Sequence, residues 1–302
     1  MHLTPPSLRA RFTAACILAA IAVPLHARGQ VVPYNPYADS QDPTPPVLPD
    51  GTIHWGTFYK SAAMQKAYER LWNLGACRNT NKAITIPVQN NRLSIDGLAE
   101  GTHRGVVKAV TGSNAGGMLA FVEPDADGQG ALERVAILHP AGVSRVEVSG
   151  SAPVAFLKPG MMVRFQATVD ARGKATAPVG VFHVIAPASE AKPMALSAGS
   201  ESLIVGRVVS LQPRVVSVRV DAGRIRRLTI PLADDAVVEV QTSEVALASP
   251  GDSVEIEGRL WSGEGSLGDG SVFSDRIRVL KRLPADSPRD TPAPGATDVG
   301  AR

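Results

Sequence analysis

The chain has 302 residues, of which 44% are hydrophobic and 5% aromatic, with 31 basic residues against 28 acidic ones. Three of the basic residues, Arg9, Arg11 and Arg28, lie in the first 29 residues, and without them 28 basic residues balance 28 acidic ones. Nucleic-acid binders normally carry a clear excess of Lys and Arg, so this balance argues against nucleic acid as a partner.

Residues 1 to 29 have the pattern of a secretory signal peptide. Arg9 and Arg11 form a positive n-region, Phe12 to Val23 is a short uncharged apolar run, and small residues around Ala27 offer a cleavage site. Cys16 precedes most of the apolar run, which argues against a lipoprotein anchor. No later segment approaches the roughly eighteen apolar residues that a membrane span needs. We therefore expect an exported protein, periplasmic or extracellular, that is not transmembrane.

A proline-rich segment and one helix come next. Residues 30 to 57 contain six prolines, which predict an extended linker because proline denies regular helix and ladder hydrogen bonds. Helix-forming residues follow one another from Phe58 to Leu74 without Gly or Pro. One apolar stripe runs along this helix, formed by Met64, Tyr68, Leu71 and Trp72. We expect the stripe to pack on a neighbouring barrel, and the alternative is that it binds a protein partner or a second copy of the chain.

A lone cysteine and a predicted β-hairpin follow the helix. Cys77 is the only cysteine after residue 29, so it has no partner for a disulfide within the mature chain. Three alternatives stay open for this thiol: a buried small apolar residue, an intermolecular disulfide, or a reactive nucleophile. Residues 83 to 97 alternate apolar and polar side chains around Asn90-Asn91, which predicts a hairpin. The helix and this hairpin together make a segment from residue 58 to residue 100.

From residue 101 onward the sequence predicts short β-strands, one after another. The turns Pro159-Gly160 and Pro250-Gly251 each begin a strand whose apolar side chains fall at every second position. Gly105-Val106-Val107 matches Gly206-Arg207-Val208 at the start of each series. These echoes predict a divergent tandem repeat, with one β-barrel in residues 101–187 and another in residues 201–283. Residues 188–200 form a linker, and residues 284–302 have the composition of a disordered tail.

Each predicted unit has five or six short antiparallel strands with Gly-rich hairpins. In this it resembles the OB-like barrels, and more particularly the small repeated β-barrel domains of uncharacterised secreted bacterial proteins. The resemblance rests on Gly-x-Val in the first strand and Pro-Gly-x-x-Val in a late one, and it covers roughly residues 101 to 283. It implies a mainly β fold class: two tandem small OB-like antiparallel barrels, preceded by one α-helix and a β-hairpin. It also implies a binding scaffold, because such barrels host many unrelated functions.

The sequence shows no spacing typical of a metal or catalytic site. The histidines after residue 29 are far apart in the chain, at His54, His103, His139 and His183. Asp125 to Gly130 is similar to the start of a calcium loop, but Ala136 stands where an EF-hand needs Glu, so we expect a hairpin turn. Neither a nucleophile elbow nor a phosphate loop is present. We therefore predict no metal, no cofactor and no enzymatic activity, with an enzyme that uses Cys77 as the alternative.

Basic residues gather in the early strands of the second unit. They are Arg207, Arg214, Arg219, Arg224, Arg226 and Arg227. In an OB-like barrel this is the general area that binds extended polymers, so the group predicts an anion-binding site. The alternative is that Glu239, Glu255 and Glu257 neutralise these arginines in cross-strand pairs. No aromatic residue lies between Gly206 and Gly258, so an acidic glycan fits better than nucleic acid, whose bases need stacking partners.

These features together predict an exported, non-catalytic binding or assembly module. As an assembly module it would find a protein partner, or associate with itself, through Cys77 or the helix. As a binding module it would hold an anionic polymer at the second barrel.

Overall fold

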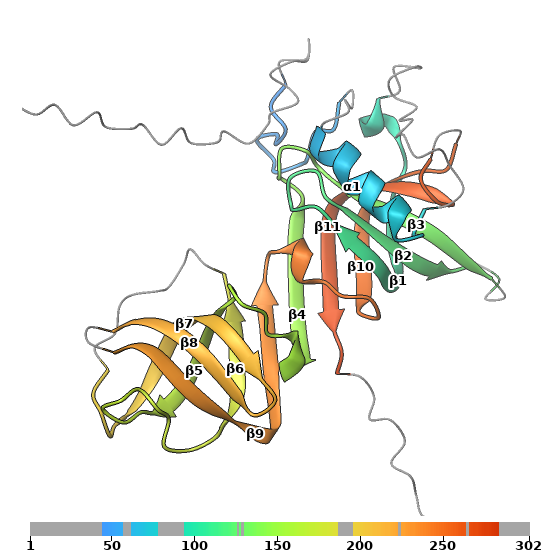
Figure 1. Ribbon diagram of the computed structural model, residues 1–302. Helices are drawn as coiled ribbons and strands as arrows, with labels where there is room; N and C mark the ends of the chain where they lie inside the picture. The colour runs from blue at the N-terminus through green and yellow to red at the C-terminus, as the bar shows by residue number, and fades with distance from the viewer. Residues whose placement is uncertain are drawn as a thin grey trace, which may run out of the picture. The chain divides into compact units, whose positions relative to one another are not determined.

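The computed structural model describes residues 44–56, 62–77, 94–125, 127, 130–186, 196–222, 225–263 and 266–283. This part of the chain is mainly β, as expected, with one α-helix, α1 (Ala62–Asn73), and three short 3-10 helices (Figure 1). None of its helices is long and apolar enough to cross a membrane. The predicted signal peptide, the tail after residue 283, most of the predicted hairpin and Arg224 lie outside the described residues.

The strands fall close to the positions that apolar alternation predicts. In chain order they are β1 (Glu100–Thr111), β2 (Met118–Pro124), β3 (Ala131–Leu138), β4 (Arg145–Pro153), β5 (Met162–Thr168), β6 (Val179–Ile185), β7 (Glu201–Gln212), β8 (Val215–Ala222), β9 (Ile225–Thr242), β10 (Ser253–Trp261) and β11 (Gly270–Lys281). The hairpin predicted around Asp125 to Gly130 is confirmed, because β2 and β3 pair antiparallel on either side of it. Strand β9, at 18 residues, is the longest strand of the described residues, and different parts of it pair with β8, β6 and β4.

Five strands close on themselves as a barrel, which we call the first ring. Their order is β10-β1-β2-β3-β11, and β10 pairs with β11 to complete the circle. Neighbours are antiparallel except β3 and β11, which run parallel.

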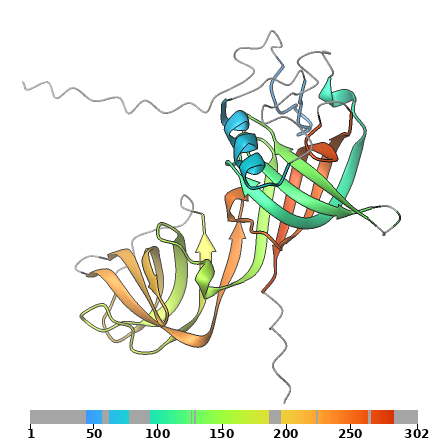
Figure 2. The same cartoon turned by 45° about the vertical axis from the view of Figure 1, so that its right-hand side comes forward.

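A second circle of pairings follows the order β9-β6-β5-β7-β8 and closes where β8 pairs with β9. We call it the second ring (Figure 2). Here β6 and β9 are the parallel neighbours.

The predicted arrangement of two tandem barrels is not confirmed. Each ring takes strands from both predicted ranges, 101–187 and 201–283, because β10 and β11 complete the first ring while β5 and β6 complete the second. Strand β4 joins the two sets, pairing with β11 in parallel and with β9 antiparallel. The alternation of apolar and polar side chains shows that a segment is a strand and which of its faces is buried. It does not show whether the neighbouring strand in the sheet is near or far in the sequence.

The two Pro-Gly turns that the sequence singles out make equivalent contacts. The N–H of Gly251 donates to the carbonyl of Val107 over 2.9 Å, and the N–H of Gly160 donates to the carbonyl of Val208 over 2.8 Å. In the strands that follow, Val254 lies opposite Gly105 and Val163 lies opposite Gly206. A side chain at either of these glycines would meet the neighbouring strand, with a Cβ only 2.2 Å from the carbonyl oxygen of Val122 or 2.5 Å from the Val218 side chain.

The helix and the segment before it cover the outside of the first ring. Met64, Tyr68 and Leu71 are fully buried, and α1 lies across β1 and β2 (Figure 1). Ile53 and Trp55 are buried in the same apolar cluster, so the end of the segment expected to be an extended linker packs on the first ring. Ile95–Gly97 forms a 3-10 turn, so the end of the predicted hairpin is not a strand.

Candidate anion-binding site

Three of the six predicted arginines lie side by side on the second ring. Arg207 of β7 is directly opposite Arg219 of β8, and Arg219 is directly opposite Arg227 of β9. We call this row the arginine ladder. Adjacent strands are about 4.8 Å apart, so the ladder places three positive charges on consecutive rungs of the sheet.

The ladder faces outward because the residues beside it in sequence face the core. Gly206, Val208, Val218, Val220 and Leu228 are buried, whereas all three arginines are exposed. The Nη1 atom of Arg207 donates to the backbone oxygen of Gly160 over 2.8 Å. Within the described residues, Arg219 and Arg227 have no ion pair and no side-chain hydrogen bond.

In the first ring, an equivalent row of charged side chains contains both signs of charge. Arg104 of β1, Glu255 of β10 and Arg278 of β11 form an equivalent row over three adjacent strands. Glu255 accepts from both arginines over 2.7 Å, and these hydrogen bonds hold the pKa of Glu255 below its usual value. Charge alternates along this row, whereas the arginine ladder carries one sign throughout. Like charges directly opposite each other destabilise a sheet by up to about 1 kcal/mol per pair.

The acidic residues expected to neutralise the ladder are engaged elsewhere. Glu257 pairs with Arg276 and Arg278, so with Glu255 it belongs to the first ring. Glu239 accepts from the hydroxyl of Ser151 over 2.8 Å. The alternative that these glutamates neutralise the predicted arginines is not confirmed for Arg207, Arg219 or Arg227, because the pairing of the strands places the glutamates on other surfaces.

A turn beside β9 adds two further cations near the ladder. The turn between β5 and β6 carries Arg172 and Lys174, both exposed, and Lys174 bridges to Thr229 of β9. Asp170 shapes this turn by accepting from the backbone N–H of Lys174 and of Arg172, which lowers the pKa of its carboxyl group. Gly173 has a φ of +79° and lies against the backbone of Arg227, where a Cβ would come within 2.6 Å of its carbonyl oxygen.

Of the remaining predicted arginines that the structure describes, Arg214 and Arg226 do not join the ladder. Arg214 lies in the turn between β7 and β8 and pairs with Asp234 over 3.3 Å, with both side chains largely exposed. Arg226 is exposed, but it precedes Arg227 in the strand and so points to the opposite side.

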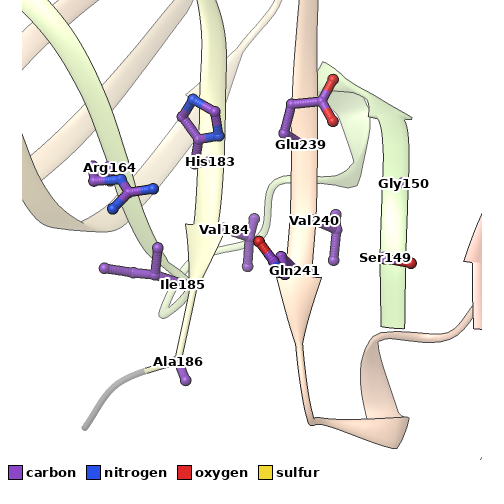
Figure 3. A pocket seen from close by; sticks show the side chains of 10 residues that line it. All are labelled: Ser149, Gly150, Arg164, His183, Val184, Ile185, Ala186, Glu239, Val240 and Gln241. Atoms are coloured by element: carbon purple, nitrogen blue, oxygen red, sulfur yellow. The ribbon is translucent and has the colours of Figure 1, made fainter. Parts of the chain in front are cut away.

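The second ring also bears a polar groove that the sequence did not reveal. Its volume is about 470 Å³, and its polar lining comes from Ser149, Arg164, His183, Glu239 and Gln241. Figure 3 shows Arg164 and His183 on strands β5 and β6, and Glu239 and Gln241 on β9. We call it the polar groove. The only signal in the sequence is that each residue takes an outward position in an alternating strand, and most polar residues of a β protein do the same.

The sites proposed for assembly are buried inside the chain. Cys77 has none of its surface exposed, and burial, together with Glu133, raises the pKa of its thiol to about 12. Such a thiol stays protonated at neutral pH and is a poor nucleophile. Met64, Tyr68 and Leu71 are fully buried, and Trp72 packs against the same cluster. The apolar stripe of the helix therefore packs against the chain's own sheet, which was the first of the two expectations for it.

The histidines do not form a metal site among the described residues, where no group of three or more His, Cys, Asp or Glu side chains comes together. His139 is fully buried against the ring of Trp55, with centroids 4.8 Å apart, and burial lowers its pKa to about 4. The indole N–H of Trp55 donates to Asp275 over 2.7 Å. These groups hold the segment before α1 onto the first ring.

No protein-family model, curated protein or solved structure matches this chain. The resemblance to OB-like repeat proteins therefore stays a prediction.

Proposed function

We propose that this chain is an exported, non-catalytic binding module whose second ring holds an extended anionic ligand across the arginine ladder. The observation that carries the proposal is the pair of consecutive Arg–Arg contacts from β7 to β8 to β9. Such a row does not stabilise the fold, because like charges on directly opposite residues repel each other and destabilise the sheet. A ligand that supplies negative charge on successive units removes this cost and releases counterions.

Two further features support a polymer as the ligand. The ladder runs across the strands, so a chain lying along it would meet one arginine per strand and then reach the turn with Arg172 and Lys174. OB-folds also bind oligonucleotides and oligosaccharides on the outer face of neighbouring strands and on adjacent loops, so the predicted resemblance supports a polymer ligand on this face.

The chemistry around the ladder favours an acidic glycan over nucleic acid. The sequence has no aromatic residue from Gly206 to Gly258, so unpaired bases would find no ring to stack on in these strands. The balanced charge of the chain after residue 29 likewise lacks the excess expected of a general phosphate-binding protein. Export would place the protein where cell-surface glycans occur.

The proposal is tested by measuring the affinity of the protein for a fluorescent acidic polysaccharide at several salt concentrations. We expect saturable binding that weakens steeply as salt rises, because exposed charges are screened over a Debye length of about 10 Å at 0.1 M. A neutral polysaccharide of the same length serves as the control. Equal binding of the two polymers, or an affinity for the acidic one that does not respond to salt, would refute the proposal.

A further inference from the structure

We propose that the polar groove is a subsite for one acidic sugar unit, whose carboxylate contacts Arg164 and His183 while its hydroxyl groups donate to Glu239 and Gln241. The inference rests on the proposed function in one respect, since it names the class of anionic ligand as a glycan. Binding of a single sugar to the groove nevertheless does not require the ladder.

The groove has a basic side and an acceptor side on three successive strands. Arg164 of β5 lies opposite His183 of β6, and His183 lies opposite Glu239 of β9. All three face outward, because the residues before and after each of them are buried. Two strand spacings separate the ends of this row, which is roughly 10 Å. One small molecule can therefore reach both sides.

The basic side suits a carboxylate. A guanidinium group has five N–H donors, so Arg164 can donate to a ligand carboxylate in addition to its contact within the chain, and the imidazole of His183 beside it can donate once more. Figure 3 shows the Arg164 and His183 side chains on neighbouring strands at one side of the groove.

The acceptor side suits hydroxyl groups and not a second anion. A carboxylate has about four acceptor positions, and Ser151 occupies one on Glu239. The remaining positions can accept from sugar hydroxyls, and the amide of Gln241 can both accept and donate. A ligand with a phosphate on every unit would bring negative charge against Glu239. A uronic acid brings one carboxylate and several hydroxyls, so its groups match both sides.

The first ring lacks this arrangement at the corresponding positions. Glu255 corresponds to Arg164 there and Arg278 to His183, because the two strand pairs have the same register after their Pro-Gly turns. Glu255 and Arg278 satisfy each other in an ion pair of 2.7 Å. Within the described residues no ion pair joins His183 to Glu239. These two side chains of the second ring can therefore both contact a ligand.

A neighbouring hollow gives room for the sugar next in line. Strands β5 and β6 pair only from Met162 to Arg164, whereas β10 and β11 pair along their whole length. Where β5 and β6 part, a hollow of about 540 Å³ opens that shares Arg164 and His183 with the groove. Both volumes lie in the range of small-molecule sites.

The test is an NMR titration of the protein with three probes: glucuronate, acetate and glucose. We expect glucuronate to bind more tightly than acetate or glucose, and to shift the ring signals of His183. Glu239→Ala should weaken glucuronate binding at least about tenfold without weakening acetate. Arg164→Gln should weaken both glucuronate and acetate. Glu147→Ala, which removes an exposed glutamate of the neighbouring strand β4, is the matched control and should change none of the affinities.

Several outcomes would overturn the inference. They are equal affinities for glucuronate and acetate, unchanged glucuronate binding in folded Glu239→Ala, or tighter binding of inorganic phosphate than of glucuronate. The last result would replace the sugar by a phosphate ligand. The ladder variant Arg219→Glu separates the two proposals, since it should leave glucuronate binding intact. Loss of polysaccharide binding with retained glucuronate binding is the expected result for this variant, whereas retained binding of both ligands would count against the ladder alone.

Discussion

Replacing Arg219 by Glu should stabilise the fold and impair binding at the same time. Arg219 is the middle rung of the arginine ladder, so the change converts two like-charge contacts into two opposite-charge contacts, with Arg207 and Arg227. Cross-strand pairs are worth roughly 0.2–1 kcal/mol each, so the free energy of unfolding should rise by about 1 kcal/mol. For a domain of this size that corresponds to about 2–4 °C in the thermal midpoint. The affinity for an acidic polysaccharide should fall at least about tenfold.

Calorimetry at low and high salt, combined with the polysaccharide titration, is the assay. Arg219→Gln separates loss of positive charge from gain of negative charge, and the extra stability of the Glu variant should shrink as salt screens the pairs. Arg278→Glu is the matched control, because it puts like charge beside Glu255 and Glu257 and should lower the midpoint while leaving binding unchanged. A destabilised Arg219→Glu protein, or one that binds the polysaccharide as before, would refute the reasoning.

Three further predictions concern stability and reactivity. Lys281→Met should lower the free energy of unfolding by about 3–5 kcal/mol in urea, because it removes the partner 2.7 Å from the buried Asp252 carboxylate. The double variant with Asp252→Asn should recover part of this loss. A loss below about 1 kcal/mol for Lys281→Met would contradict the account. Because burial lowers the pKa of His139 from 6.5 to about 4, the unfolded chain takes up a proton in this range and the folded one does not. Stability should therefore fall by about 3 kcal/mol between pH 6.5 and pH 4, and an equally steep profile in His139→Asn would disprove this cause. Cys77, with a pKa near 12, should react with a thiol reagent at pH 8 only as fast as the fold opens, so labelling at the rate of the denatured protein would be inconsistent with its burial.

The sequence predicted strands and faces well because these depend on local pattern. Val254 and Ile256 alternate with Glu255 and Glu257, and the structure buries the first two while the glutamates reach outward. The helix stripe at Met64, Tyr68 and Leu71 was also readable, since a spacing of three or four residues puts side chains on one helix face.

The pairing of the strands could not be predicted from the sequence, because it depends on contacts between segments far apart in the chain. Nothing in β10 distinguishes β1 from β7 as its neighbour, since both offer a glycine where the close approach occurs, Gly105 or Gly206. The candidate site could not be predicted fully for the same reason. Composition identified a group of arginines, but only the register of β7, β8 and β9 shows that Arg207, Arg219 and Arg227 form one row. Trp55 was missed for a similar reason, because its partner Asp275 is 220 residues away.

The most direct test of the central claim is to follow the Nε–Hε signals of the arginine side chains by NMR while an acidic polysaccharide is added. The account predicts that Arg207, Arg219 and Arg227 shift together and saturate at one concentration. The arginines of the neutralised row, Arg104 and Arg278, should keep their positions. Shifts confined to the first ring, or no arginine shift at a concentration where the polymer is bound, would contradict the claim that the ladder is the binding surface.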